Sequence, residues 1–186
     1  MNETESYIAD QIRLRVWSGL CEHDEVQEMI SDILEEDADE QMLRELVAVE
    51  FDRKSESEKS WPDRTDFDRL DAAFSSLRQR GIIAIHNAGW DKSEAFHNCL
   101  EEFRAQGKPE HLFGICYYTS QDIDGAINGR GIYLGYSSTR PEMEESDAVR
   151  AGTLICSELE KVRLQTEWGG NAQSRIKVDL VWQKRG

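Results

Sequence analysis

Residues 164–182 read LQTEWGGNAQSRIKVDLVW, and this stretch decides the kind of fold that the chain can adopt. Two runs within it alternate apolar and polar residues, which is the period of a β-strand with one covered face. Gly169-Gly170-Asn171 separates the two runs and is typical of a turn. We therefore predict a β-hairpin here, with one face packed against a core and the other face wetter.

The residues before this hairpin alternate between helical and strand patterns. Apolar residues at helical spacing indicate helices over Phe67–Leu77, Phe96–Phe103 and Ala148–Val162, with a short helix from Ser120 to about Gly129. Buried strands are predicted at residues 82–86, 111–118 and 131–136. With the hairpin, the order after the first helix is β-α-β-α-β-α-β-β. We predict an α+β fold, in which a mixed β-sheet carries its helices mainly on one face.

The first third of the sequence has three apolar stripes at helical spacing and no strand pattern. A polar stretch, RKSESEKSWPDRTD, begins at Arg53 and is the best candidate for a linker. Pro62 within it disfavours helix at the residue before it. We therefore predict a helical N-terminal subdomain at residues 1–60 and an α/β domain at residues 61–186.

The charge of the chain limits the classes of partner. There are 37 Asp and Glu residues against 22 Lys and Arg, which gives a formal net charge of -15. Such a surface repels nucleic-acid phosphates and anionic membranes, so we expect neither as a partner. It accelerates the approach of a basic protein, and a toxin domain is one candidate. The simpler interpretation is that the acidity serves solubility alone.

The sequence shows no familiar catalytic machinery. It has no GxxxxGK[ST], GxGxxG, HExxH or GxSxG motif, and its four cysteines lie outside any CxxC spacing. We therefore expect no catalytic residue, no metal ligand and no cofactor. Neither a signal peptide nor an apolar run long enough for a membrane span occurs, so we expect a cytoplasmic protein with free thiols.

Five acidic residues cluster between the second and third predicted helices, and we predict that they contact a basic partner. They are Glu35, Glu36, Asp37, Asp39 and Glu40. The alternative is that they form a solvated connection between two helices.

A second group of polar residues follows the ends of predicted strands, where a small ligand could bind. The group comprises His86, Asn87, Tyr118, Gln121, Asp122 and Arg130. A helix start offers free N–H groups to an anion, and an arginine adds further donors. The alternative is local and structural, because Ser120 can cap the short helix and Asp122 can stabilise its first turn.

Three stretches resemble an uncharacterised bacterial family that carries a domain of unknown function. They are LDAAFSSLRQRGIIAIHNAG from Leu70, YYTSQDIDGAINGRGIYLGY from Tyr117, and the terminal hairpin through Trp182. The resemblance extends over about residues 66–182 and implies no particular activity. Some relatives carry a cysteine cluster after the first strand, but this chain has HNAGWDKSEAF there and no cysteine.

These observations favour an acidic protein-binding module, foremost an inhibitor or immunity protein that occludes the basic active site of a bacterial toxin. An alternative is a small-ligand-binding protein or an enzyme with its site at the strand ends. A third hypothesis is a module that dimerises through its terminal hairpin, with Trp182 exposed on an edge strand.

Overall fold

The computed structural model describes residues 1–186 and divides into two compact units. The helical unit comprises Met1–Thr65 together with Gln183–Gly186, and the α/β unit comprises Asp66–Trp182. The division along the chain falls at Thr65, a few residues after the boundary predicted at residue 60. The last four residues group with the helical unit, which the sequence did not indicate.

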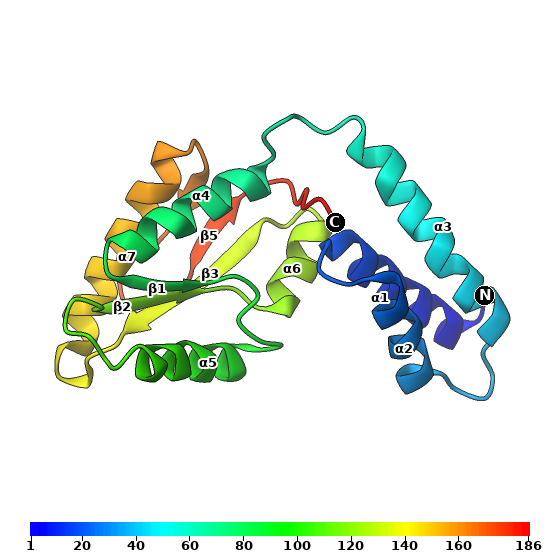
Figure 1. Cartoon of the computed structure of the whole chain (residues 1–186), viewed down its shortest axis with the longest axis horizontal. Coiled ribbons are helices and arrows are strands. Elements are labelled where there is room, and N and C mark those ends of the chain that lie inside the picture. The colour runs from blue at the N-terminus through cyan, green and yellow to red at the C-terminus, as the bar shows by residue number, and fades with distance from the viewer. The chain divides into compact units, whose positions relative to one another are not determined.

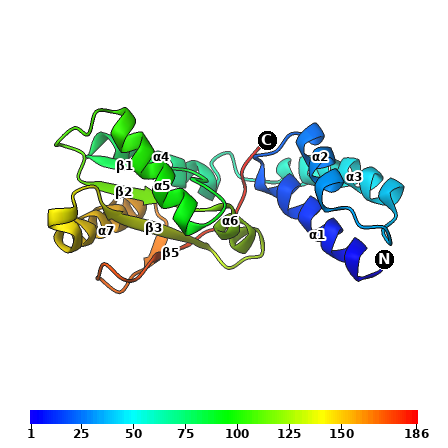
Figure 2. The same cartoon turned by 90° about the horizontal axis from the view of Figure 1, so that it is seen from below.

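The helical unit consists of three helices, α1 (Glu3–Ser18), α2 (His23–Ile33) and α3 (Glu40–Glu58), which pack side by side (Figure 2). The three predicted apolar stripes form its core. The fully or almost fully buried side chains are Ile8, Ile12, Val16, Val26, Ile30, Leu43 and Val47.

The polar stretch predicted as a linker is helical at its start, because α3 continues to Glu58. Ion pairs at helical spacing stabilise this last part, including one between Lys54 and Glu58. Residues such as Arg, Lys and Glu are also good helix formers, so polarity alone did not distinguish a solvated helix from a linker.

The α/β unit contains a five-stranded sheet with the strand order β1-β2-β3-β5-β4. Strands β1 and β2 are parallel and all other neighbours are antiparallel, so the sheet is mixed as predicted. Its strands are β1 (Ile82–Ile85), β2 (Gly114–Tyr117), β3 (Ile132–Ser138), β4 (Gln165–Glu167) and β5 (Ile176–Asp179). Its helices are α4 (Asp66–Gln79), α5 (Lys92–Ala105), α6 (Ser120–Ile127), the short 3-10 helix η1 (Pro141–Met143) and α7 (Glu144–Lys161).

Helices lie mainly on one face of the sheet, and the predicted α+β class is confirmed. Side chains of α4, α6 and α7 share one core with alternate strand residues such as Ile82 and Cys116. The intervening residues, such as Ile83 and Ile115, point to the opposite face and pack against α5. Figure 1 shows α4 and α7 on one side of the strands and α5 on the other.

The predicted terminal hairpin is present, with Thr166 of β4 opposite Val178 of β5. Trp182 follows β5 and is buried rather than exposed, since its ring lies 5.4 Å from Phe67 and 5.9 Å from Tyr118 between centroids. The structure therefore offers no exposed Trp182 edge of the kind that a hairpin-mediated dimer would use. None of the helices has both the length and the apolar character needed to cross a bilayer.

Candidate functional site

Acidic residues are concentrated in the helical unit. It is the smaller of the two units, yet it holds 19 of the 37 Asp and Glu residues against 9 of the 22 Lys and Arg residues. The α/β unit holds 18 acidic and 13 basic residues. The surplus negative charge is therefore uneven along the chain.

Much of this surplus lies on the side of α2 that faces away from the core. The buried residues Val26 and Ile30 occupy the inner side of the helix. Acidic residues occupy the outer side at four-residue spacing and continue beyond the end of the helix. We call this set the α2 acidic face, and it comprises Asp24, Glu28, Asp32, Glu35 and Glu36, all of them exposed.

No lysine or arginine forms an ion pair with the α2 acidic face. Its one ion pair joins Asp24 to the adjacent His23, at 3.6 Å between Oδ1 and Nδ1, and this pair is charged only when the histidine is protonated. Like charges four residues apart destabilise a helix by roughly 0.2–0.5 kcal/mol per pair. The last turn of α2 also lacks a basic residue, so Asp32 lies near the negative end of the helix dipole uncompensated. At Glu28 and Asp32 this arrangement costs stability, whereas Asp24 lies in the first turn, where the helix dipole favours a negative charge.

The five residues predicted to bind a partner lie between α2 and α3 or at the start of α3, and all are exposed. Three of them also act within the unit. Asp37 accepts a hydrogen bond from Thr4 Oγ1 at 3.3 Å, Asp39 caps α3 by accepting from Met42 N at 3.0 Å, and Glu40 pairs with Arg44 at 2.8 Å. Glu35 and Glu36 have no such partner, and they join the α2 acidic face.

At the strand ends, the structure brings two of the six predicted ligand residues into direct contact. Strands β1 and β2 are parallel, so the residues that follow them, His86 and Tyr118, lie at the same edge of the sheet. His86 Nδ1 is 2.9 Å from the Tyr118 hydroxyl, and its Nε2 is 3.1 Å from Asp71 Oδ1. The imidazole also stacks on Phe74 with 4.3 Å between ring centroids.

The hydrogen bonds of this edge are largely satisfied from within. Tyr118 is fully buried, and burial together with the charge of Asp71 raises the pKa of its hydroxyl, which therefore stays protonated. Asn87 adopts a left-handed backbone with φ of 44°, and its Oδ1 accepts a hydrogen bond of 2.8 Å from Ser120 Oγ.

The other three predicted ligand residues lie apart from His86. Asp122 is buried and accepts two hydrogen bonds from Arg175, at 2.8 Å from Nη1 and 2.6 Å from Nη2. Gln121 is exposed on α6. Arg130 lines a cavity of about 390 Å³ that Lys177 and Asp179 also line, and none of the other five residues lines it. The six residues therefore do not surround one shared cavity.

The cysteines and acidic residues do not assemble a metal site, since no three His, Cys, Asp or Glu side chains are placed to hold an ion. Cys99 and Cys116 are buried, and burial raises the pKa of the Cys99 thiol to about 12. Such a thiol is a poor nucleophile.

Comparison with known protein families decides the classification of the chain. Residues 1–186 match the family described as Domain of unknown function (DUF6891). The chain belongs to this family. The match confirms that the chain carries a domain of an uncharacterised family, and it covers the helical unit as well as the α/β unit. No curated protein and no solved structure matches the chain.

Sequence reasoning missed three members of the α2 acidic face, which are Asp24, Glu28 and Asp32. The sequence pattern that could have identified them was present, because they repeat every four residues on the side of the helix opposite the apolar stripe. It also missed the partners Asp71 and Arg175. Arg175 lies far from Asp122 in the sequence, and no local pattern indicated that they pair.

Proposed function

We propose that the chain is a protein-binding module whose α2 acidic face docks on a basic surface of another protein. The observation that supports this most is the row of exposed carboxylates without Lys or Arg partners on α2 and the residues that follow it. Repulsion between neighbours in this row costs stability, and no lysine or arginine pairs with it. A basic partner would offset it on binding.

Within this proposal, the chain acts as an inhibitor of the immunity-protein kind in the cytoplasm, and its target is a bacterial toxin. A toxin that acts on nucleotides or nucleic acid needs a cationic cleft to hold phosphates. A row of carboxylates can occupy the positions of those phosphates and occlude the cleft. Because buried ion pairs carry a desolvation cost, fast association and specificity are the expected gains.

The test compares the wild-type chain with a variant in which the α2 acidic face is neutralised. The substitutions are Asp24→Asn, Glu28→Gln, Asp32→Asn, Glu35→Gln and Glu36→Gln. Each chain is immobilised, exposed to a lysate of cells that produce it, and the proteins retained at stoichiometric amounts are identified. We expect the wild type to retain a basic protein, whose association rate falls at least tenfold with the variant. The wild-type chain should also inhibit the catalytic activity of that protein.

A control variant neutralises five exposed carboxylates of the α/β unit and so changes the net charge equally. Its substitutions are to glutamine at Glu110, Glu142, Glu144, Glu145 and Glu160. The control should bind the partner like the wild type, at both low and high salt. Retention of no stoichiometric partner, or an equal loss of binding in both variants, contradicts the proposal.

A second candidate function is a small-ligand site or an enzyme site at the strand ends. It is supported by the contacts of His86 with Asp71 on one side and Tyr118 on the other. A carboxylate that orients an imidazole is an arrangement that acid–base sites use. His86 also remains partly open to solvent, with its side chain 23% exposed. A ligand here should shift the His86 ring resonances in an NMR titration with a metabolite mixture, and an unchanged spectrum speaks against this candidate.

A further inference from the structure

The α/β unit contains a cavity of about 430 Å³ along one side of α7, which we call the α7 cavity. Residues of α7 line it at the three- and four-residue spacing that places side chains on one side of a helix. They are Arg150, Thr153, Leu154 and Ser157. Arg80, which follows α4, and Phe113, which precedes β2, complete the lining. Ligand pockets typically measure ~300–1,000 Å³, so the volume suits a small molecule.

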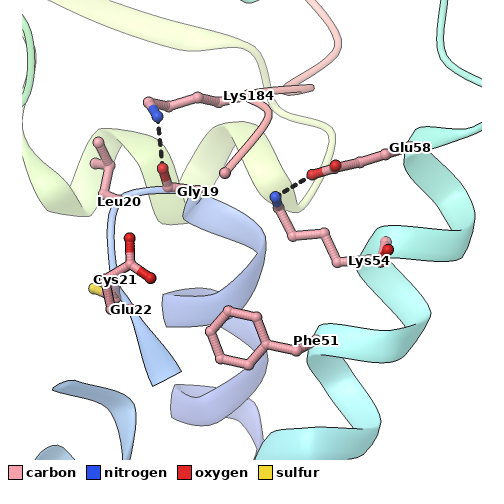
Figure 3. Close-up of a pocket in the computed structure, with 10 residues that line it drawn as sticks. Gly19, Leu20, Cys21, Glu22, Phe51, Lys54, Glu58 and Lys184 are labelled. Carbon is pink, nitrogen blue, oxygen red and sulfur yellow. Dashed lines mark hydrogen bonds and ion pairs between the residues drawn. The ribbon is translucent and has the colours of Figure 1, made fainter. Parts of the chain in front are cut away.

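The charged residues that line the α7 cavity are both basic. They are Arg80 and Arg150, and no carboxylate lines the cavity. Figure 3 shows the contrast in a cavity of the helical unit, where Lys54 meets Glu58 and is already paired. A cationic lining in a chain with a formal net charge of -15 is therefore a local exception to the acidity of the protein.

Arg150 is exposed, yet a contact within the protein holds its guanidinium in place. The guanidinium carbon lies 3.7 Å from the centroid of the Phe113 ring, and Phe113 is itself buried in the core. Arg150 forms no ion pair, and none of its guanidinium N–H groups donates to a protein acceptor. Stacking on an aromatic face leaves the N–H groups at the edge of a guanidinium available. Arg150 therefore presents an ordered fork of donors that no protein group uses.

Arg80 belongs to a second cationic group beside this fork. Its Nη1 donates to Glu158, whereas its Nε and Nη2 have no protein acceptor. Glu158 also accepts from Lys161 Nζ at 2.6 Å, so one carboxylate contacts two cations. Together with Arg150, the group contains three cations and one carboxylate, an excess of two positive charges. Because salt screens charges beyond about 8 Å, this local excess attracts an anion more than the distant carboxylates repel it.

The packing around Phe113 brings the two arginines to the same cavity. Phe113 N donates to the carbonyl of Gly81 at 3.0 Å, so the residue next to Arg80 lies against the ring that supports Arg150. Farther along α7, the half-buried Ser157 has a hydroxyl without a hydrogen-bond partner, whereas the Thr153 hydroxyl already donates to the Val149 carbonyl at 2.9 Å. The lining thus offers two guanidinium groups and one free hydroxyl.

We propose that the α7 cavity binds the phosphate group of a small phosphate monoester. The phosphate oxygens accept from Arg150 and from the free N–H groups of Arg80, and the rest of the ligand lies along α7 towards Ser157. A phosphate monoester carries about -1.5 to -2 charge at pH 7 and has three strong acceptor oxygens. This matches the excess of two positive charges, and a guanidinium fork binds phosphate oxygens in pairs. A monocarboxylate has less charge and fewer oxygens.

This site is separate from the sites already described. It shares no residue with the α2 acidic face, so its test does not depend on the proposed protein partner. It also differs from the strand ends at His86 and Tyr118, because Arg80 and Phe113 lie before β1 and β2, at the opposite ends of these parallel strands.

The test is an NMR titration of the full chain at about pH 7.5, where a monoester is mostly a dianion. The probes are glucose 6-phosphate, glycerol 3-phosphate and AMP up to about 10 mM, which detects dissociation constants in the millimolar range. At least one of them should shift the amide resonances of Phe113, Arg150 and Ser157 in a saturable manner. Its dephosphorylated counterpart, and the dicarboxylate malonate, should each bind at least tenfold more weakly.

The Arg150→Met variant keeps an unbranched apolar side chain against Phe113 and removes the guanidinium, and it should weaken binding at least tenfold. The matched control is Arg104→Met, which removes an exposed arginine of α5 and should bind like the wild type. Binding of none of the three monoesters overturns the proposal, as does equal binding by the wild type and Arg150→Met. Equal binding of malonate overturns the phosphate class. A short phosphoserine peptide that binds tenfold more tightly than every small monoester overturns the small-molecule source.

Discussion

Asp122 is the residue for which the ligand-site and the structural interpretations make opposite predictions. Its side chain is 8% exposed and pairs with Arg175 through both oxygens. It also accepts from Thr119 N at 2.9 Å and Thr119 Oγ1 at 2.8 Å, at the start of α6. The substitution Asp122→Ala removes all four hydrogen bonds at once.

The loss of stability in Asp122→Ala depends on the groups that lose their hydrogen-bond acceptor. The guanidinium of Arg175 is 23% exposed, and its Nε already lacks an acceptor. Removing one partner of a buried ion pair costs about 3–5 kcal/mol. The lost part of the capping box adds up to about 1 kcal/mol, although Thr119 still caps the helix. We expect Asp122→Ala to destabilise the α/β unit by about 4 kcal/mol, which is a large share of the ~5–15 kcal/mol of a typical domain.

The partner substitution should cost less. In Arg175→Met the carboxylate of Asp122 keeps its two hydrogen bonds from Thr119, so we expect a loss of about 2 kcal/mol. The double variant should lose at least about 1.5 kcal/mol less than the sum of the two single variants, because neither charge is then left alone.

Native-state hydrogen exchange of the β3 and β5 amides measures the free energy of unfolding of the α/β unit directly. A cost of Asp122→Ala below about 1 kcal/mol, or exact additivity in the double variant, refutes the structural role assigned to the pair. Asp122 would then be available as a ligand group, as the sequence first suggested.

Three further predictions concern a buried carboxylate, a tightly packed glycine and a buried thiol. Burial raises the pKa of Glu158, but hydrogen bonds from Lys161 and other donors outweigh it and lower the pKa from 4.5 to about 2. The stability that Glu158 contributes, up to about 3 kcal/mol, is complete above pH 4.5 and is lost as the pH falls toward 2. The free energy of unfolding of Glu158→Gln should therefore depend less on pH in this range than that of the wild type. An equal pH dependence in the two proteins contradicts the prediction. Gly152→Ala should destabilise the α/β unit by about 1 kcal/mol, although alanine has the better helix propensity. The reason is that the added Cβ would lie 2.5 Å from the Trp168 ring. Thermal denaturation measures this change, and a stabilised variant contradicts the prediction. Cys99 should resist alkylation in the native chain at about pH 8 and react only on unfolding, as mass spectrometry can follow, and rapid native labelling would contradict its burial.

The fold was largely predictable from the sequence because each element has a clear period. Alternation identified β5, and apolar stripes identified α4 and α7, since both patterns reflect a face that must be buried. The end of α3 was not predictable in this way. Residues after Arg53 lack an apolar stripe, so ion pairs and helix propensity stabilise this part of α3 rather than the burial of apolar side chains.

The candidate sites were less predictable, because their meaning depends on partners distant in the sequence. Strand ends were located correctly, and His86 and Tyr118 do meet at one edge. The sequence did not indicate which polar side chains already have hydrogen-bond partners. The partner of Asp122, for example, comes from the distant segment before β5. Local sequence indicates where polar groups lie, whereas tertiary packing decides which of them remain free for a ligand.

Both units pair their buried carboxylates with cations, as Glu50 with Arg53 in the helical unit, but only the helical unit has a row of like charges along one helix. This difference bears on whether the acidity serves solubility alone. In the α/β unit the most buried carboxylates are matched by cations, as with Asp122 and Arg175, and Asp147 and Arg140. In the helical unit the α2 acidic face has no matching lysine or arginine. Solubility requires a net charge but not its concentration along one helix, where repulsion is greatest and Asp32 opposes the helix dipole. A requirement for solubility alone would be met at lower cost by spreading the same carboxylates over both units. This concentration is the ground on which we propose that the row of carboxylates meets a cationic surface.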